Sequence, residues 1–116
     1  MPPATVSKRV NYLVDTVNYN IYTEQMIGGF RHKRLEEIHL TGRTRRIGAD
    51  QIRECVRILQ LLEVAGQPGD LNIAGLRFHA LQGSPKRWSV RVTGNYRITF
   101  GWSGEYALGV DFEDYH

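Results

Sequence analysis

Four residues in the second half of the chain carry side chains suited to acid–base and phosphate chemistry: His79, Arg97, Tyr115 and His116. Histidine titrates near neutral pH, so it can both remove and supply a proton. Arginine presents a planar charged fork that matches a phosphate group, and tyrosine can orient a group or stack on a base. Cleavage of RNA needs only these functions, because the 2′-hydroxyl is itself the nucleophile and the protein moves protons and stabilises charge. No metal or other cofactor is needed for this reaction, and we expect none.

The charge distribution favours contact with nucleic acid. Lys plus Arg number 15 and Asp plus Glu number 12, which gives a net charge of +3. Residues 71–100 contain no acidic residue, and their basic residues are Arg77, Lys86, Arg87, Arg91 and Arg97. A second basic group consists of Arg43, Arg45 and Arg46. Clustered positive charge attracts phosphate whatever the net charge, although solvated arginines on an inert surface give the same pattern.

The histidines also have plainer interpretations. Alternation in LRFHALQG places His79 with Arg77 on the polar side of a strand, where a histidine with no function is common. Tyr115 and His116 directly follow an apolar strand that contains Leu108, Val110 and Phe112. We expect that strand to hold Tyr115 and His116 near a sheet edge, whereas a frayed polar tail is the alternative.

The elements that must position these residues follow an α+β pattern. A chain of 116 residues with 41% hydrophobic and 23% charged residues fits one ordered domain. Helical spacing is visible over 30–40 and again from Asp50, a plausible N-cap, to a stop at Gly66 and Pro68. From residue 73 onward the chain is typical of strands, separated by the turns GSPK, TGN and SGE. The sequence thus predicts two helices followed by antiparallel strands.

The parity of two strands predicts their register. Trp88, Val90 and Val92 alternate with polar residues, as do Tyr96, Ile98 and Phe100. Facing residues share one side of a sheet, so a three-residue loop over 93–95 pairs these two apolar sets, whereas a two-residue loop does not. The same register places Arg91 opposite Arg97. Such a pair is unfavourable unless both side chains reach water or an anion lies between them.

The remaining features indicate the compartment. Cys55 is the single cysteine, lies on the apolar side of the second helix, and is expected to be plain core. The chain contains no cysteine pair for a disulfide, no apolar run long enough for a bilayer and no pattern of a secretion signal. We therefore expect a cytoplasmic protein without membrane contact.

The sequence from Met26 to His116 resembles the HigB toxins of the RelE/ParE superfamily, the plasmid maintenance killer type. The resemblance is carried by MIGGFRHKRLEE, DLNIAGLRFHALQG, RWSVRVTGNYRITF and VDFEDYH. Such toxins begin at a position that matches Met26, so residues 1–25 are expected to be an N-terminal extension or an upstream start, and 26–116 the RelE-like toxin domain.

The resemblance implies a fold, an activity and partners. The fold is two N-terminal helices packed on a small, mostly antiparallel curved sheet. The activity is that of a type II toxin, a metal-independent endoribonuclease that cleaves mRNA on the ribosome. The partners are a HigA-type helix-turn-helix antitoxin, through which alone DNA would be contacted, and the ribosome with its mRNA.

The resemblance also assigns roles to residues. His79 matches the family's strand histidine, Arg97 the arginine that contacts the scissile phosphate, and Tyr115 and His116 the terminal catalytic pair. We expect Gln82, Lys86, Arg87 and Arg91 to bind phosphate or RNA, and Arg43, Arg45 and Arg46 to dock on the ribosome. Gln82 occupies a position where relatives often carry lysine, so one phosphate-stabilising charge is missing. A non-catalytic binder on the same fold, which inhibits a target such as gyrase by occupancy, is the alternative function.

Overall fold

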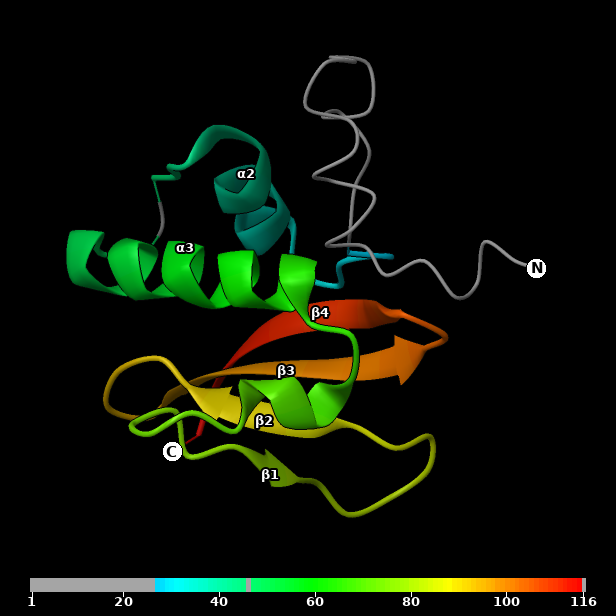
Figure 1. Ribbon diagram of the computed structural model, residues 1–116. Helices are drawn as coiled ribbons and strands as arrows, with labels where there is room; N and C mark the ends of the chain where they lie inside the picture. Colours follow the sequence, from blue (N-terminus) through cyan, green and yellow to red (C-terminus); the bar gives the residue numbers. More distant parts are fainter. Residues whose placement is uncertain (1–26, 46, 116) are drawn as a thin grey trace, which may run out of the picture.

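The computed structural model describes residues 27–45 and 47–115. The expectations for residues 1–25, Met26, Arg46 and His116 lie outside these residues. The elements follow one another as α2 (Lys33–Thr41), α3 (Ala49–Val64), the short 3₁₀ helix η4 (Pro68–Leu71), β1 (His79–Ala80), β2 (Trp88–Arg91), β3 (Tyr96–Ser103) and β4 (Tyr106–Asp114). The four strands form one sheet in the order β1-β2-β3-β4 with every neighbouring pair antiparallel, and the helices form a second layer (Figure 1). The expected α+β fold is confirmed.

Helix α2 begins later than the apolar spacing predicts, because Phe30 and Arg31 pair with the sheet instead. Phe30 forms a parallel bridge with Val110, and the Arg31 N–H donates to the Val110 carbonyl at 2.8 Å. The His32 side chain then accepts a hydrogen bond from the Leu35 N–H and caps the helix. This early contact joins the start of the described chain to the outer edge of β4.

Helix α3 supplies most of the helical part of the core. Its buried residues are Cys55, Ile58, Leu59 and Leu62. The expected caps are wrong: the N-cap is Gly48 and Asp50 lies in the first turn, while the C-cap is Ala65 rather than Gly66. The carboxylate of Asp50 still faces the positive end of the helix dipole. Burial of Cys55 confirms that it is core.

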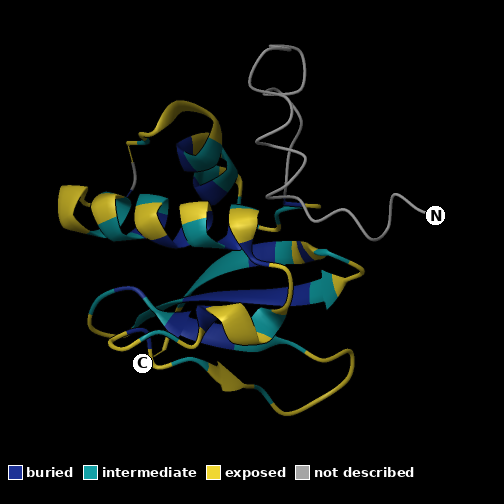
Figure 2. Cartoon of the chain, viewed as in Figure 1, coloured by how far each residue is buried: buried dark blue, intermediate teal, exposed yellow. Residues whose placement is uncertain are grey.

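The core lies between the helices and one face of the sheet. On the strands its fully buried members include Val90, Ile98, Phe100 and Val110. Figure 2 shows the buried side of α3 turned toward the buried residues of the sheet, with exposed residues on the outside. The opposite face of the sheet is therefore left for function, and we refer to it as the strand face.

The predicted hairpin register is confirmed. Trp88 pairs with Phe100, Val90 with Ile98 and Arg91 with Arg97. The Val92 N–H donates to the Tyr96 carbonyl at 2.9 Å, which closes the three-residue loop, and Gly94 adopts a φ of 53°. Glycine tolerates this left-handed conformation without steric cost.

Two expected alternations are interrupted. Arg77 has a φ of 51°, so the strand around His79 shrinks to two residues and the expected regular alternation from Leu76 onward is wrong. On β3 and β4 the register shifts between Thr99 and Gly101, and this bulge leaves Leu108 37% exposed instead of in the core.

Candidate active site

The register brings two rows of polar residues across the strand face. One row runs from His79 to Ser89 and on to Thr99, and the other from Arg91 to Arg97 and on to Glu113. Directly opposite residues point to the same face, and these positions alternate with the buried residues of the core. Residues from all four strands thus share one face of the sheet, on which Ser89 and Thr99 are buried.

Arg97 and Tyr115 lie together at one end of this surface. The Arg97 guanidinium lies 5.5 Å from the centre of the Tyr115 ring, and its Nη1 donates to the carbonyls of Gly94 at 2.9 Å and Tyr96 at 3.0 Å. The Tyr115 N–H donates to the Asn95 carbonyl at 2.8 Å, so the end of the chain is held against the β2–β3 loop. A cation over an aromatic ring is attracted by the ring's negative face.

His79 is exposed at the opposite edge of the surface, on β1. Its Nδ1 lies 3.0 Å from the Arg77 carbonyl. A carbonyl only accepts, so Nδ1 carries the hydrogen and the Nε2 of the neutral ring has its lone pair available. Two strand spacings separate β1 from β3, about 10 Å, so His79 and Arg97 do not touch each other and β2 lies between them.

Thr99 joins the charged residues at the centre of the surface. Arg87 Nη2 donates to Thr99 Oγ1 at 3.1 Å and to the Gly109 carbonyl at 2.8 Å, and Thr99 Oγ1 donates to a carboxylate oxygen of Glu113. Burial, followed by the nearby charge of Arg31, lowers the pKa of Arg87, while Glu113, Asp111 and Tyr115 oppose the shift. The network fixes the Arg87 side chain across the strands.

Ser89 lies between His79 and Thr99 in the first row. It is fully buried, and its Oγ has no hydrogen-bond partner within the described part of the chain. Sequence reasoning missed Ser89, Thr99 and Glu113. Their parity with Arg91 and Arg97 was the available signal, because it assigns all of them to one face.

The other expected site residues lie away from Arg97. Gln82 and Lys86 are exposed on the loop between β1 and β2, and Arg87 points to the Gly109 end of β4 rather than toward Tyr115. Arg43 and Arg45 are exposed on the loop between α2 and α3, in the helical layer. Glu37 holds this loop to α2 by accepting a hydrogen bond from Thr44 at 2.5 Å, and that bond, with the charge of Arg34, lowers the pKa of Glu37.

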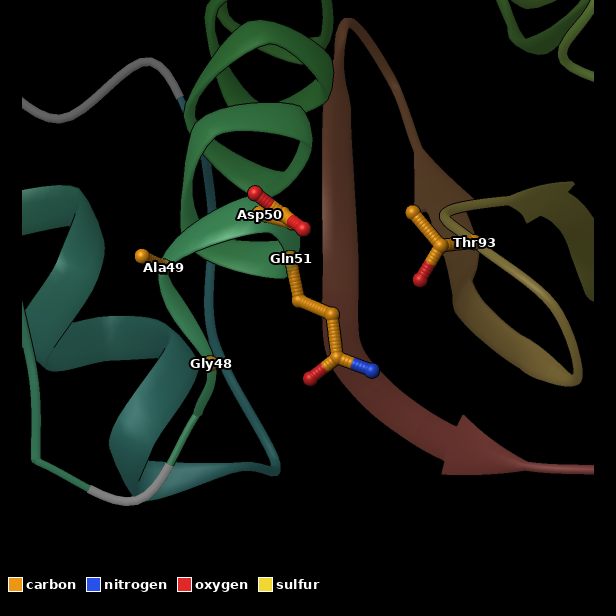
Figure 3. Close-up of a pocket in the computed structure, with 5 residues that line it drawn as sticks. All are labelled: Gly48, Ala49, Asp50, Gln51 and Thr93. Carbon is orange, nitrogen blue, oxygen red and sulfur yellow. The ribbon is translucent and has the colours of Figure 1, made fainter.

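One hollow of the described chain does not coincide with these residues. Figure 3 shows it beside the N-terminus of α3, lined by Gly48, Ala49, Asp50, Gln51 and Thr93. Its volume is about 400 Å³. The hollow contains no histidine or arginine, and no chemistry follows from it.

Residues 27–45 and 47–115 contain neither a metal-ligand cluster nor a helix that could span a membrane. Within these ranges, no three residues among His, Cys, Asp and Glu are grouped so that they could ligate a metal ion. None of the helices there combines the length and the apolar character that crossing a membrane requires.

Comparison with known proteins gives two matches. A family model described as "RelE-like toxin of type II toxin-antitoxin system HigB" matches residues 28–116. A protein of Proteus vulgaris named "Endoribonuclease HigB" is 34% identical over 92 residues, which cover 78% of this chain and 100% of the relative. The family match includes every strand and every described residue of the strand face.

Proposed function

Because the chain belongs to the HigB family of RelE-like toxins of type II toxin–antitoxin systems, we propose that its strand face is the active site of an endoribonuclease. Membership of a type II toxin family implies an antitoxin as partner. The name of the Proteus vulgaris relative supports the reaction, and the arrangement of His79, Arg97 and Tyr115 supports the place. The finer proposal is a toxin that cleaves mRNA on the ribosome without a metal ion and is neutralised by a HigA-type antitoxin.

The proposed reaction is transfer within the RNA itself. The 2′-oxygen attacks the adjacent phosphorus while the bond from phosphorus to the 5′-oxygen breaks, which leaves a 2′,3′-cyclic phosphate and a 5′-hydroxyl. The 2′-hydroxyl proton goes to one imidazole, and the leaving oxygen receives a proton from another. His79 and His116 share these two roles.

Arg97 stabilises the charge that develops on the phosphoryl oxygens, with Arg91 beside it in the register. Two of its hydrogen bonds go to loop carbonyls and its face meets Tyr115, so the guanidinium is held before substrate arrives. A group that is already oriented costs no reorganisation during the reaction. Tyr115 orients the substrate from the same position.

The proposal rests on one arrangement. Tyr115 and the β2–β3 loop hold the Arg97 side chain in place, and His79, with an available Nε2, lies at the opposite edge of the strand face. A protein that acted only by occupying its target needs no such pairing of a proton acceptor with a fixed cation. The basic loop containing Arg43, Arg45 and Arg46 would then contact ribosomal RNA, in a salt-dependent manner. DNA would be contacted only through the antitoxin complex.

Product analysis on translating ribosomes tests the reaction. We expect mRNA fragments with cyclic phosphate and 5′-hydroxyl ends, and no cleavage when the nucleotide before the cut carries 2′-deoxyribose. Metal-activated water would instead leave a 5′-phosphate or a 3′-phosphate without need of the 2′-hydroxyl. Naked RNA should be cut poorly, because the ribosome supplies part of the alignment.

Substitutions test the residues. His79→Asn and Arg97→Gln should each lower the cleavage rate by about 10²- to 10³-fold, the range for removal of a proton-transfer group or a charge stabiliser. The matched control is Arg53→Gln, which removes one exposed arginine from α3, on the helical layer. Undiminished cleavage by both strand-face variants would refute the site, and growth arrest without any cleavage would favour the binder.

A further inference from the structure

A second hollow, with basic residues in its walls, lies on the strand face at the end away from Tyr115. Its volume is about 250 Å³, and its walls include Arg31, Lys86 and Arg87 above Gly101 and Gly109. Gly101 and Gly109 belong to the irregular stretch where the register of β3 and β4 shifts. Neither the mechanism above nor the family resemblance uses Arg31.

Two guanidinium groups converge over Gly109. A Cβ placed on Gly109 would lie 3.2 Å from Arg31 Nε and 3.2 Å from Arg87 Nη1. Gly109 has a φ of 55°, so the backbone at this position favours glycine and leaves the space between the two arginines open. The close approach of two like charges is unfavourable unless an anion or water separates them.

The side chain of Arg87 and the backbone of Arg31 are held by other contacts. Arg87 Nη2 is used by Thr99 and Gly109, which leaves Nη1 toward the hollow. The backbone of Arg31 is fixed by its hydrogen bond to Val110. Among the described residues, no carboxylate forms an ion pair with Arg31 or Arg87. Burial and then the charge of Arg31 lower the pKa of Arg87, although Glu113, Asp111 and Tyr115 act in the opposite direction.

We propose that Arg31 and Arg87, with Lys86 at the rim, bind an RNA phosphate other than the one that is cleaved. A phosphodiester accepts hydrogen bonds from several donors, and arginine pairs match it well. The site lies beside Gly101, four residues along β3 from Arg97, a separation of about 13 Å. One phosphate cannot span that distance, so the two ends of the strand face bind different phosphates. The inference rests on the proposed function, since it takes RNA as the ligand of this face.

Binding of a non-cleavable RNA tests the site independently of catalysis. The probe is a short 2′-O-methyl RNA oligonucleotide, and its affinity for the full chain is measured by fluorescence anisotropy between about 50 and 200 mM salt. Arg31→Gln should weaken binding about tenfold at low salt. It should also reduce the slope of log affinity against log salt by about 0.7, the value for one phosphate contact on a single strand.

Three variants make the result specific. Arg31→Lys keeps the charge and should retain the salt slope, whereas Arg53→Gln removes an exposed arginine from α3 and should change neither quantity. Arg31 is exposed, so its variants should fold, which circular dichroism confirms. The Arg87→Gln variant also loses the hydrogen bonds to Thr99 and Gly109. Its RNA affinity is therefore compared with that of the wild type only at equal folded fraction.

A second measurement distinguishes a phosphate of the substrate strand from a phosphate of ribosomal RNA. It is the cosedimentation of the protein with ribosomes free of mRNA. Loss of oligonucleotide binding in Arg31→Gln assigns the site to the substrate strand, and loss of ribosome binding alone assigns it to ribosomal RNA. Unchanged salt slopes and affinities in both measurements would overturn the inference. Failure of the proposed function would instead show as absent cleavage by a wild-type protein that still binds the non-cleavable RNA.

Discussion

At the scale of single residues, the side chains of the strand face are of two kinds. Several are held by hydrogen bonds, whereas the Ser89 hydroxyl has no hydrogen-bond partner among the described residues. Arg97, Thr99 and Arg87 all have hydrogen-bond acceptors or donors within the protein. Ser89 is as deeply buried as Thr99, yet its hydroxyl has no partner among the described residues. Burial of a polar group without a hydrogen bond costs about 1–3 kcal/mol, so the two hydroxyl groups should respond oppositely to removal.

Ser89→Ala should therefore leave stability unchanged or raise it, by up to about 1 kcal/mol of unfolding free energy. Thr99→Val is the matched control on the same face. It should lower stability by about 1–3 kcal/mol, because it leaves Arg87 and Glu113 without their shared partner. Urea unfolding measures both, and a Ser89→Ala loss equal to that of Thr99→Val would show that the Ser89 hydroxyl is bonded after all.

Cys55 gives a pH-dependent prediction at the same scale. Burial, with a smaller effect from Glu54, raises the pKa of Cys55 from 9.0 to about 12. Between about pH 9 and 12 the thiol is neutral in the folded state but has lost its proton in the unfolded state. The contribution of the buried neutral thiol to the free energy of unfolding is therefore complete below pH 9 and is lost between about pH 9 and 12. Iodoacetamide should leave Cys55 unmodified in the native protein near pH 9 and should alkylate it in denaturant.

The control for Cys55 is Cys55→Ala, which should show a shallower fall of stability over the same pH range than the wild type. Rapid alkylation of the native protein would mean that the α3 side of the core opens readily. Equal slopes for the two proteins would show that the thiol does not contribute.

At the scale of elements, the β2–β3 loop matters because it holds a side chain as well as joining two strands. Its Gly94 carbonyl accepts from Arg97 and its Asn95 carbonyl accepts from Tyr115. The turn at the other end of β3 contains Gly104, which also has a positive φ, 61° against 53° for Gly94. Both glycines adopt a left-handed backbone conformation, and of the two turns the first contacts residues of the candidate site.

Gly94→Ala and Gly104→Ala should thus have similar effects on stability, a loss of about 1–2 kcal/mol each from a left-handed non-glycine residue. Only Gly94→Ala should also lower the cleavage rate, about tenfold or more, because it displaces the carbonyls that hold Arg97 and Tyr115. Thermal unfolding and cleavage at equal folded fraction are the measurements. Equal cleavage by the two variants would contradict the positioning role of the loop.

At the scale of the whole molecule, the core of the described chain runs from Ile27 to Val110. Ile27 is buried, and the Gly28 N–H donates to the Ala107 carbonyl at 2.7 Å, so the described chain joins the sheet at its first residues. The family match begins at residue 28. These boundaries support the proposal that 26–116 is the toxin domain and 1–25 an extension.

A chain that begins at Met26 should accordingly fold with a midpoint of unfolding within a few degrees of the full chain and should retain growth arrest and cleavage. Circular dichroism and the ribosome assay compare the two chains. Failure of the shorter chain to fold would make residues 1–25 part of the domain, and selective loss of cleavage would give them a role in substrate binding.

The sequence alone determined the elements and the register whose causes are local. The α+β order, the three-residue loop and the pairing of Arg91 with Arg97 follow from spacing and parity, since a strand alternates strictly and a loop length fixes which residues face each other. These rules also placed Arg97 on a polar face. Helix ends were less well determined: Phe30 pairs with β4 instead of starting α2, and Gly48 rather than Asp50 is the N-cap of α3.

Only the tertiary structure decided which distant residues meet. The parallel bridge from Phe30 to Val110 brings Arg31 beside Arg87, and the hold of Asn95 on Tyr115 brings the end of the chain to Arg97. The left-handed Arg77 and the bulge near Gly101 break the alternation that sequence reasoning extends. Each of these features depends either on contacts between segments far apart in the chain or on a single residue that departs from the regular backbone conformation. Neither kind of cause produces a periodic pattern in the sequence.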